Sequence, residues 1–228
     1  MGQSRGKSGG GACALEARHL TLSWDTGAHI IVRDISLRLG VGEVVCLVGR
    51  SGCGKTTIMH ALSGLSRPLK GNVFLHGEDV TGIPGRVSYM LQKDLLLPSK
   101  RIIDNVCLPL VLGGMSVPDA RAKAEPLFER FGLVGTQRRW PDELSGGMRQ
   151  RAAFLRTYLM GNDVVLLDEP FSALDRPLAK ALRADLIALL ADQDVITVWV
   201  PHDPDEAEEV SHLHLHLDGP PGTWSLSA

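Results

Sequence analysis

The sequence lacks any apolar run close to the ~18 residues that a membrane-spanning helix needs. It also has little excess charge: a net charge of −2 offers none of the basic surplus typical of nucleic-acid-binding proteins. Cysteine is scarce, and its four positions (Cys13, Cys46, Cys53 and Cys107) show no C-x-x-C spacing. We find no internal repeat either. These absences favour a reduced cytosolic protein over a membrane-spanning chain or a disulfide scaffold.

The 228 residues suffice for one large domain or for a core with a subdomain, and 44% of them are hydrophobic. Residues 1–13 are rich in Gly, Ser and basic residues and contain no apolar stretch. We expect a flexible tail there rather than a signal peptide.

A G-x-x-x-x-G-K-[ST] pattern occupies residues 49–56, between an apolar run at 44–48 and a stretch with helical character at 58–62. In this context the pattern is the phosphate-binding P-loop. Its glycines allow backbone N–H groups to approach an anion, and the following helix adds its positive dipole end. The pattern therefore predicts a nucleoside triphosphate site. The residues expected to contact the nucleotide are Gly49, Arg50, Ser51, Gly52, Cys53, Gly54, Lys55, Thr56 and Thr57, with Thr56 also placed for Mg²⁺.

Alternating residues between 15 and 39, and a short run at 72–76, predict an antiparallel sheet beside the P-loop unit. Trp24 lies at the end of one of these strands. From the residues alone it is either a half-buried packing residue or an aromatic face that stacks an adenine ring.

A further buried strand at 87–91 ends at Gln92, after which the character of the chain changes. Residues 93–161 contain a loop near Pro98 and helical spacing through 120–131, so we expect an inserted helical subdomain. The predicted core then consists of residues 14–92 and 162–228.

Residues 144–151 read Leu-Ser-Gly-Gly-Met-Arg-Gln-Arg and precede a good helix-forming stretch. Ser145 is suited to the N-cap of that helix. A Ser-Gly-Gly sequence that opens a helix forms an anion site by geometry, although alone it is a weak signal.

The uninterrupted apolar run at 164–167 predicts a strand buried on both faces, as in a parallel sheet. Asp168 and Glu169 therefore stand at its carboxyl end, where open α/β sheets bind ligands. Beside a P-loop, Asp168 suits Mg²⁺ binding and Glu169 suits polarisation of an attacking water.

The next strand, at 195–200, places His202 at a carboxyl end too, although a solvated loop histidine is the favoured interpretation when this residue is considered alone. The last predicted strand, at 212–217, alternates His212, His214 and His216 with leucines. We interpret this row as the polar face of a half-buried strand, because its histidines stand too far apart to ligate one metal ion together.

With these residues in order, the sequence resembles the ATP-binding subunits of ABC transporters from about Leu15 to Leu217. Residues 49–56 resemble Walker A, Gln92 the Q-loop, residues 144–150 the signature motif, and residues 164–169 Walker B. Residues 172–175 resemble the D-loop, and His202 the switch histidine. The chain is thus expected to be an α/β P-loop ATPase with a mainly parallel sheet, an antiparallel β subdomain and a helical insert.

The resemblance implies a head-to-tail dimer in which each ATP lies between the P-loop of one chain and the signature helix of the other. Trp24 would stack adenine; Ser145, Gly146 and Gly147 would clasp the partner's ATP; and Asp175 would couple the two sites. Gln92 would sense Mg²⁺ and the attacking water, and His202 would contact the γ-phosphate beside the base Glu169. Membrane permease subunits, a solute-binding protein and a peripheral location on the cytoplasmic face follow from the same resemblance.

Residues 148–159 resemble nitrate/sulfonate/taurine-type importers, and within them the ATPases for thiamine-precursor pyrimidines. Two positions depart from the family pattern: Pro201 precedes the switch histidine, and His212 replaces an aspartate. A non-transport ABC protein would carry a coiled-coil insertion, tandem cassettes or a basic surface, none of which is present. A P-loop kinase or GTPase would lack the signature helix and the Asp168–Glu169 pair.

Overall fold

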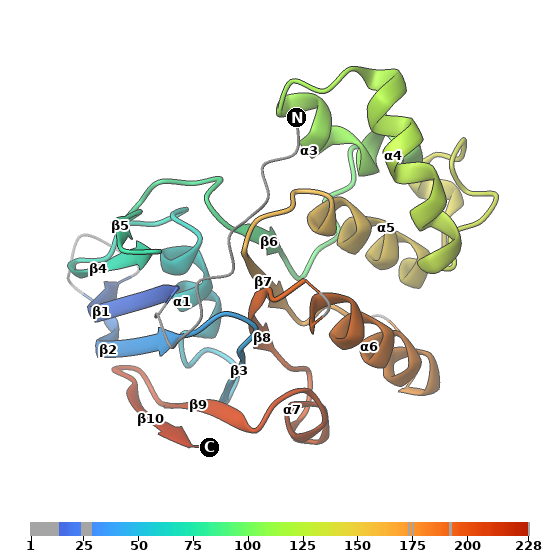
Figure 1. Ribbon diagram of the computed structural model, residues 1–228. Helices are drawn as coiled ribbons and strands as arrows, with labels where there is room; N and C mark the ends of the chain where they lie inside the picture. Colours follow the sequence, from blue (N-terminus) through green and yellow to red (C-terminus); the bar gives the residue numbers. More distant parts are fainter. Residues whose placement is uncertain (1–13, 24–28, 173, 175, 192, 228) are drawn as a thin grey trace.

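The computed structural model describes residues 14–23, 29–172, 174, 176–191 and 193–227, so the predictions for the tail at 1–13, for Trp24 and for Asp175 lie outside it. The described chain forms two sheets with most of its helices on one side (Figure 1). The strands are β1 (Leu15–Ser23), β2 (Ile30–Leu39), β3 (Val44–Gly49), β4 (Lys70–Leu75), β5 (Glu78–Asp79), β6 (Ser88–Met90), β7 (Val164–Asp168), β8 (Ile196–Val200), β9 (Leu213–Asp218) and β10 (Thr223–Ser227). The α-helices are α1 (Lys55–Leu62), α2 (Ile102–Val106), α3 (Leu108–Leu112), α4 (Val117–Arg130), α5 (Gly146–Tyr158), α6 (Arg176–Ala191) and α7 (Pro204–Val210), and a short 3-10 helix covers Pro141–Glu143.

The larger sheet has the strand order β10-β9-β3-β8-β7-β6. Every neighbouring pair from β9 to β6 is parallel, and only β10 pairs antiparallel, with β9. Strands β7 and β8 are buried along their whole length, which for β7 is the prediction from its uninterrupted apolar run at 164–167. Because parallel strands end at the same edge, β3, β7 and β8 deliver their following loops to one place.

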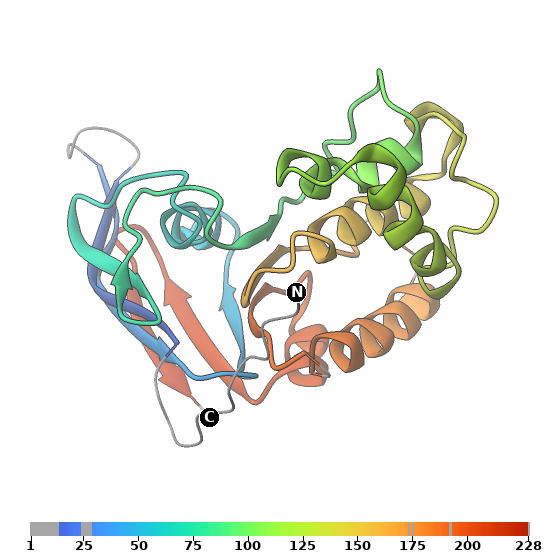
Figure 2. The same cartoon turned by 45° about the horizontal axis from the view of Figure 1, so that its top comes forward.

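The smaller sheet is antiparallel, with the order β2-β1-β4-β5, and lies opposite one face of the larger sheet (Figure 2). Helix α1 packs into the core between them through Ile58, Met59, Ala61 and Leu62. The residues of β7 and β8 that face this core alternate along each strand, as Val164 and Leu166 illustrate. The P-loop helix is thus held from both sides.

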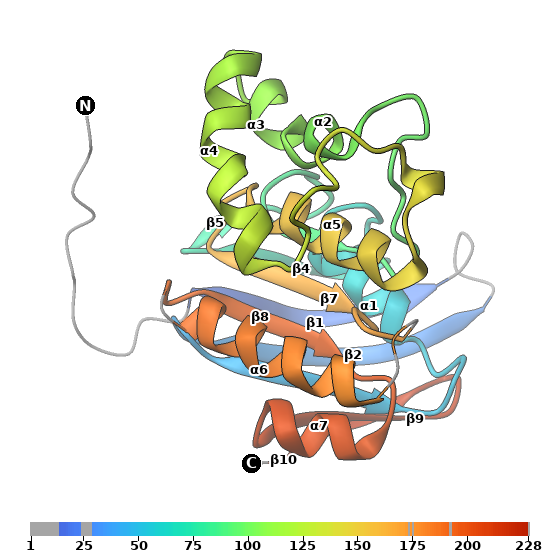
Figure 3. The same ribbon diagram turned by 90° about the vertical axis from the view of Figure 1, so that its right-hand side faces the viewer.

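The opposite face of the larger sheet is covered by helices from the 93–161 segment together with α6 and α7 (Figure 3). The remaining β7 residues, Val165 and Leu167, face this second core, as does the fully buried Trp199 of β8. Helix α5 contributes Phe154 and Leu155 to it. One sheet therefore separates two cores by the simple alternation of its side chains.

The predicted α/β class, the mainly parallel sheet and the antiparallel sheet are confirmed. The prediction that the strand at 212–217 is the last one is wrong, because β10 follows and forms a hairpin with β9. His212 also lies outside the strand, so the three histidines do not form one strand face. His214 is buried and bonds the Ser211 carbonyl at 2.7 Å, whereas His216 is exposed. Helices α2, α3, α6 and α7 had no predicted counterpart.

Within the described residues, no helix is both long enough and apolar enough to cross a membrane.

Gly71 in β4 provides a test of the antiparallel sheet. Its φ is +84°, and a Cβ there would stand 2.2 Å from the Arg18 carbonyl oxygen. Gly77, in the turn after β4, has φ +83° with open space around its Cβ position. We expect Gly71→Ala to lower the free energy of unfolding by about 1–3 kcal/mol more than Gly77→Ala, because only the former adds overpacking to backbone strain. Urea denaturation measures both, and equal losses would contradict the clash.

Candidate functional site

The P-loop connects the end of β3 to the first turn of α1. Gly54 caps this helix in a left-handed conformation, with φ 110° and no side-chain hydrogen bond to the helix start. The first turn contains no acidic residue. The unpaired N–H groups and the positive dipole end therefore face the loop without competition from a carboxylate, which suits an anion.

Two glycines of this loop are required by close contacts. A Cβ at Gly49 would stand 2.5 Å from the Leu217 carbonyl oxygen, and one at Gly54 would stand 2.7 Å from Ile31. Both also have positive φ values, of 158° and 110°. Gly52 has φ +81° but open space around it, so its bare backbone faces the cleft.

The charged group of Lys55 lies across the loop. Its ammonium donates to the carbonyl oxygens of Gly49 at 2.6 Å and Arg50 at 3.2 Å. Cys53 points the other way: its side chain is 3% exposed and belongs to the core around α1. The Lys55 ammonium is thus held against the loop by two carbonyl oxygens, and Cys53 fills space in the core.

Asp168 meets the loop from the end of β7. Its Oδ2 accepts hydrogen bonds from the Thr56 hydroxyl at 3.1 Å and from the Tyr89 phenol at 3.4 Å. Burial raises the pKa of Asp168, while the Thr56 bond opposes that rise and the neighbouring Glu169 charge adds to it. Burial, with Asp168 beside it, also raises the pKa of Tyr89, which keeps the phenol protonated as a donor.

Glu169, the next residue, faces two polar side chains from other loops. The Gln92 amide donates to its Oε2 at 2.8 Å, and His202 Nδ1 stands 3.9 Å from the same oxygen. Glu169 has φ +47°, uncommon for a residue with a side chain, and its N–H bonds the Val200 carbonyl at 3.0 Å. Its backbone is therefore held in a strained conformation that aims the carboxylate.

Lys55, Thr56, Gln92, Asp168, Glu169 and His202 line one cleft of about 410 Å³ at the carboxyl edge of the sheet. Its lining combines N–H donors, one ammonium, two carboxylates and neutral polar groups, which suits a phosphate chain with a cation. The lining residues are Gly49, Ser51, Gly52, Gly54, Lys55, Thr56, Thr57, Gln92, Asp168, Glu169, Pro201 and His202.

The signature residues do not line this cleft. Ser145 instead caps α5, accepting from the Met148 N–H at 3.3 Å, and Gly146 and Gly147 form the first turn. A Cβ at Gly147 would stand 2.2 Å from a terminal methyl group of Leu174, so the two residues are closely packed. Arg50 lines a separate pocket with Trp224 and His216. One chain thus has two helix N-termini suited to anions, at α1 and at α5, and they lie in different places.

From the sequence, Tyr89 is only part of the buried strand predicted at 87–91, and Pro201 is only a departure from the family pattern before His202. The structure adds both to the site, Tyr89 through its bond to Asp168 and Pro201 as a lining residue. A signal existed for Tyr89, because it lies three residues before Gln92 in the predicted strand. The register that aligns it with Leu166 could not be read from the sequence.

The ABC transporter family model matches residues 32–172. The chain is 38% identical to the ABC transporter ATP-binding protein YtlC of Bacillus subtilis over 192 residues, which cover 84% of this chain and 74% of YtlC. It is 37% identical to the formylaminopyrimidine import ATP-binding protein ThiZ of Halalkalibacterium halodurans (85% and 75% covered). It is 41% identical to the Fe(3+) ions import ATP-binding protein FbpC of Agrobacterium fabrum, of which it spans only 53%.

Among solved structures, the chain is similar to a dimeric post-hydrolysis state of the ATP-binding cassette MJ0796 bound to ADP and Pi. The TM-score is 0.80 at 25% identity, and the match covers 89% of this chain and 93% of that one.

Replacement of Lys55 tests the phosphate site. Lys55→Ala should weaken ATP binding by about 2–3 kcal/mol, because a charge-assisted contact to phosphate is lost. Isothermal titration with ATP measures this loss. Lys123→Ala, on the exposed face of α4, is the matched control and should bind as the parent does. Unchanged affinity in Lys55→Ala would contradict the site.

Replacement of Asp168 tests the electrostatics. Its raised pKa means that the ionised carboxylate destabilises the folded state at pH values above that pKa. Asp168→Asn keeps an acceptor for Thr56 without the charge, so it should raise the melting temperature of the nucleotide-free protein at pH 7. The gain should shrink as pH falls through the raised pKa, because the parent side chain then protonates. Asp185→Asn, exposed on α6, should show no such rise in melting temperature. A rise in Asp168→Asn that grew as the pH fell would contradict the raised pKa of Asp168.

Proposed function

The chain belongs to the ABC transporter family of ATP-binding proteins, and we propose that it is the ATPase subunit of an importer, hydrolysing ATP to drive solute uptake through separate membrane subunits. The observation that carries this proposal is the Glu169 carboxylate. It stands beside a P-loop, an amide and an imidazole in one cleft. That is the arrangement needed to bind a triphosphate and activate a water against its terminal phosphate.

Within this proposal each cleft residue has a distinct role. Lys55 and the loop N–H groups hold the β- and γ-phosphates, and Glu169 is the general base that polarises water. Gln92 orients Glu169 and the water through its 2.8 Å bond. His202, whose side chain is 59% exposed, reaches toward the γ-phosphate.

Mg²⁺ fits the oxygen ligands present. Thr56 and Asp168 place a hydroxyl and a carboxylate oxygen 3.1 Å apart, and both are ligands that a hard cation prefers. The described residues contain no group of three or more His, Cys, Asp or Glu side chains that could hold a metal alone. Phosphate oxygens and waters would therefore complete the coordination, with Gln92 within reach. The ion would neutralise phosphate charge during hydrolysis.

We further propose that two chains assemble head to tail, so that Ser145, Gly146 and Gly147 clasp the nucleotide held by the partner. The position of these residues away from the cleft of their own chain supports this arrangement. Trp24 would stack the adenine and Asp175 would couple the two sites, as the family resemblance implies.

The helical segment at 93–161 is the proposed docking region for the permease subunits. It carries exposed apolar side chains that the core of this chain does not use: Leu95 is 52% exposed, Leu97 38% and Leu112 78%. The protein would then lie on the cytoplasmic face of the membrane as a peripheral subunit, with a solute-binding protein delivering cargo from the other side. The similarity to ThiZ makes formylaminopyrimidine the first solute to test. This choice agrees with the resemblance to ATPases for thiamine-precursor pyrimidines.

Replacement of Glu169 tests the catalytic role. Glu169→Gln should retain ATP binding but slow turnover by roughly 10²–10⁴-fold, because the base is lost while the P-loop is unchanged. ATP should then hold the chains as a stable dimer, which size-exclusion chromatography measures. The matched control is Glu129→Gln, on the exposed side of α4, with parental turnover.

The same pair of variants tests the transport role. Membrane subunits should co-purify with both, but only Glu129→Gln should support uptake of solute into vesicles. Parental hydrolysis by Glu169→Gln would remove Glu169 from the base role. Parental solute uptake by Glu169→Gln, despite lost hydrolysis, would remove the proposed coupling of ATP hydrolysis to import.

A further inference from the structure

A buried carboxylate stands directly behind the switch histidine. Glu206, in the first turn of α7, is only 4% exposed. Its Oε1 accepts the indole N–H of Trp199 at 2.9 Å, and its Oε2 accepts the backbone N–H of His202 at 3.0 Å. A carboxylate withdrawn from water needs such donors, so Glu206 binds both its neighbours firmly.

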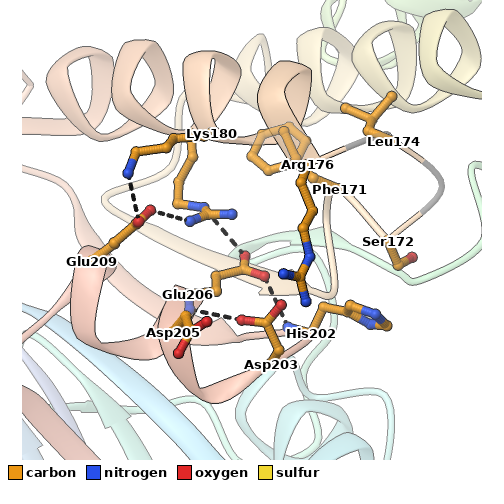
Figure 4. A pocket seen from close by; sticks show the side chains of 12 residues that line it. Phe171, Ser172, Leu174, Arg176, Lys180, His202, Asp203, Asp205, Glu206 and Glu209 are labelled. Carbon is orange, nitrogen blue, oxygen red and sulfur yellow. Dashed lines mark hydrogen bonds and ion pairs between the residues drawn. The ribbon is translucent and has the colours of Figure 1, made fainter.

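Helix α6 supplies the counter-charge. Arg183, whose side chain is 11% exposed, pairs with Glu206 Oε1 through its Nε at 3.7 Å and also donates to Glu209. Lys180 of the same helix bonds Glu209 at 2.9 Å. Figure 4 shows these groups in the pocket of about 360 Å³ between α6, α7 and the segment around Ser172. These ion pairs link α6 to α7 next to the backbone of His202.

The bond from the His202 N–H to Glu206 anchors the loop that follows β8. Pro201 precedes His202 and has no N–H, so the His202 N–H is the first donor after β8 that can anchor the loop. Asp203 caps α7 by accepting from the Glu206 N–H at 2.9 Å. Trp199 is itself packed against Phe171, with ring centroids 6.0 Å apart. The His202 main chain is therefore clamped to a fully buried group, while its imidazole remains in the cleft.

We propose that Glu206 is a positioning residue for His202: it fixes the distance of the imidazole from Glu169 and the γ-phosphate, with Trp199 and Arg183 holding Glu206 in turn. This inference rests on the proposed role of His202 at the phosphate. The competing explanation is that the Arg183–Glu206 pair only joins α6 to α7, as a buried ion pair can do without affecting chemistry.

Steady-state hydrolysis of MgATP by the purified full chain tests the inference. Glu206→Gln and Trp199→Phe each remove part of the clamp, and Trp199→Phe keeps the aromatic ring against Phe171. Each should lower kcat by about ten- to a hundredfold, the cost of a small misplacement, with KM for ATP within about twofold of the parent. Glu208→Gln is the matched control, because Glu208 is on the same helix with its side chain 75% exposed, and it should leave kcat unchanged.

Combination with His202→Ala separates positioning from general stability. If Glu206 acts through His202, Glu206→Gln/His202→Ala and Trp199→Phe/His202→Ala should turn over no more slowly than His202→Ala alone. If the double variants are slower than His202→Ala by the same factor that separates the single variants from the parent, the role of Glu206 is purely structural and the inference is overturned. Parental kcat in Glu206→Gln when His202→Ala is slow would also overturn it.

Two other outcomes are also decisive. If His202→Ala itself hydrolyses ATP like the parent, the proposed role of His202 fails and this inference fails with it. If Glu206→Gln does not fold, as circular dichroism would reveal, Trp199→Phe alone and with His202→Ala decides the question by the same comparison.

Discussion

The site depends on the parallel alignment of three strands that lie side by side. Strands β3, β8 and β7 are neighbours, with Cys46 in register with Trp199 and Trp199 with Leu167. Because their polypeptides run in the same direction, the residues that follow each strand emerge at one edge. The P-loop, the Asp168–Glu169 pair and His202 are far apart in sequence and meet only for this reason. Any reversal of one strand would leave the phosphate loop without its carboxylates.

The two faces of the larger sheet pack against different parts of the chain. On one face, α1 is enclosed between the two sheets, so the helix that begins at the P-loop is packed from both sides. On the other face, the 93–161 segment, α6 and α7 share a separate core. Gln92 and His202, for which we propose a response to nucleotide, both line the cleft. The two faces of one sheet therefore belong to separate cores within one chain.

Two buried carboxylates lie near this edge of the sheet. Asp168 and Glu206 are both nearly inaccessible, at 5% and 4% exposure, and each receives hydrogen bonds from two side-chain or backbone donors of other elements. In each case an aromatic residue packed against the core supplies a donor: the partly buried Tyr89 to Asp168 and the fully buried Trp199 to Glu206. These aromatic donors join the packing of the strands to the orientation of polar groups, because the ring is fixed by the core and its polar atom by the carboxylate.

The local sequence by itself determined the P-loop, the buried strand that ends in Asp168, the α/β class and the helix that begins after Ser145. Each of these depends on short-range physics: the φ freedom of glycine, the period of apolar residues and the capping of a helix start. Only the tertiary structure decided that β10 closes a hairpin on β9, that His214 is buried while His216 is not, and that Tyr89 and Glu206 stand behind the site. Those facts depend on strand register and on which helix covers which face, and neither is encoded within a local window of the chain.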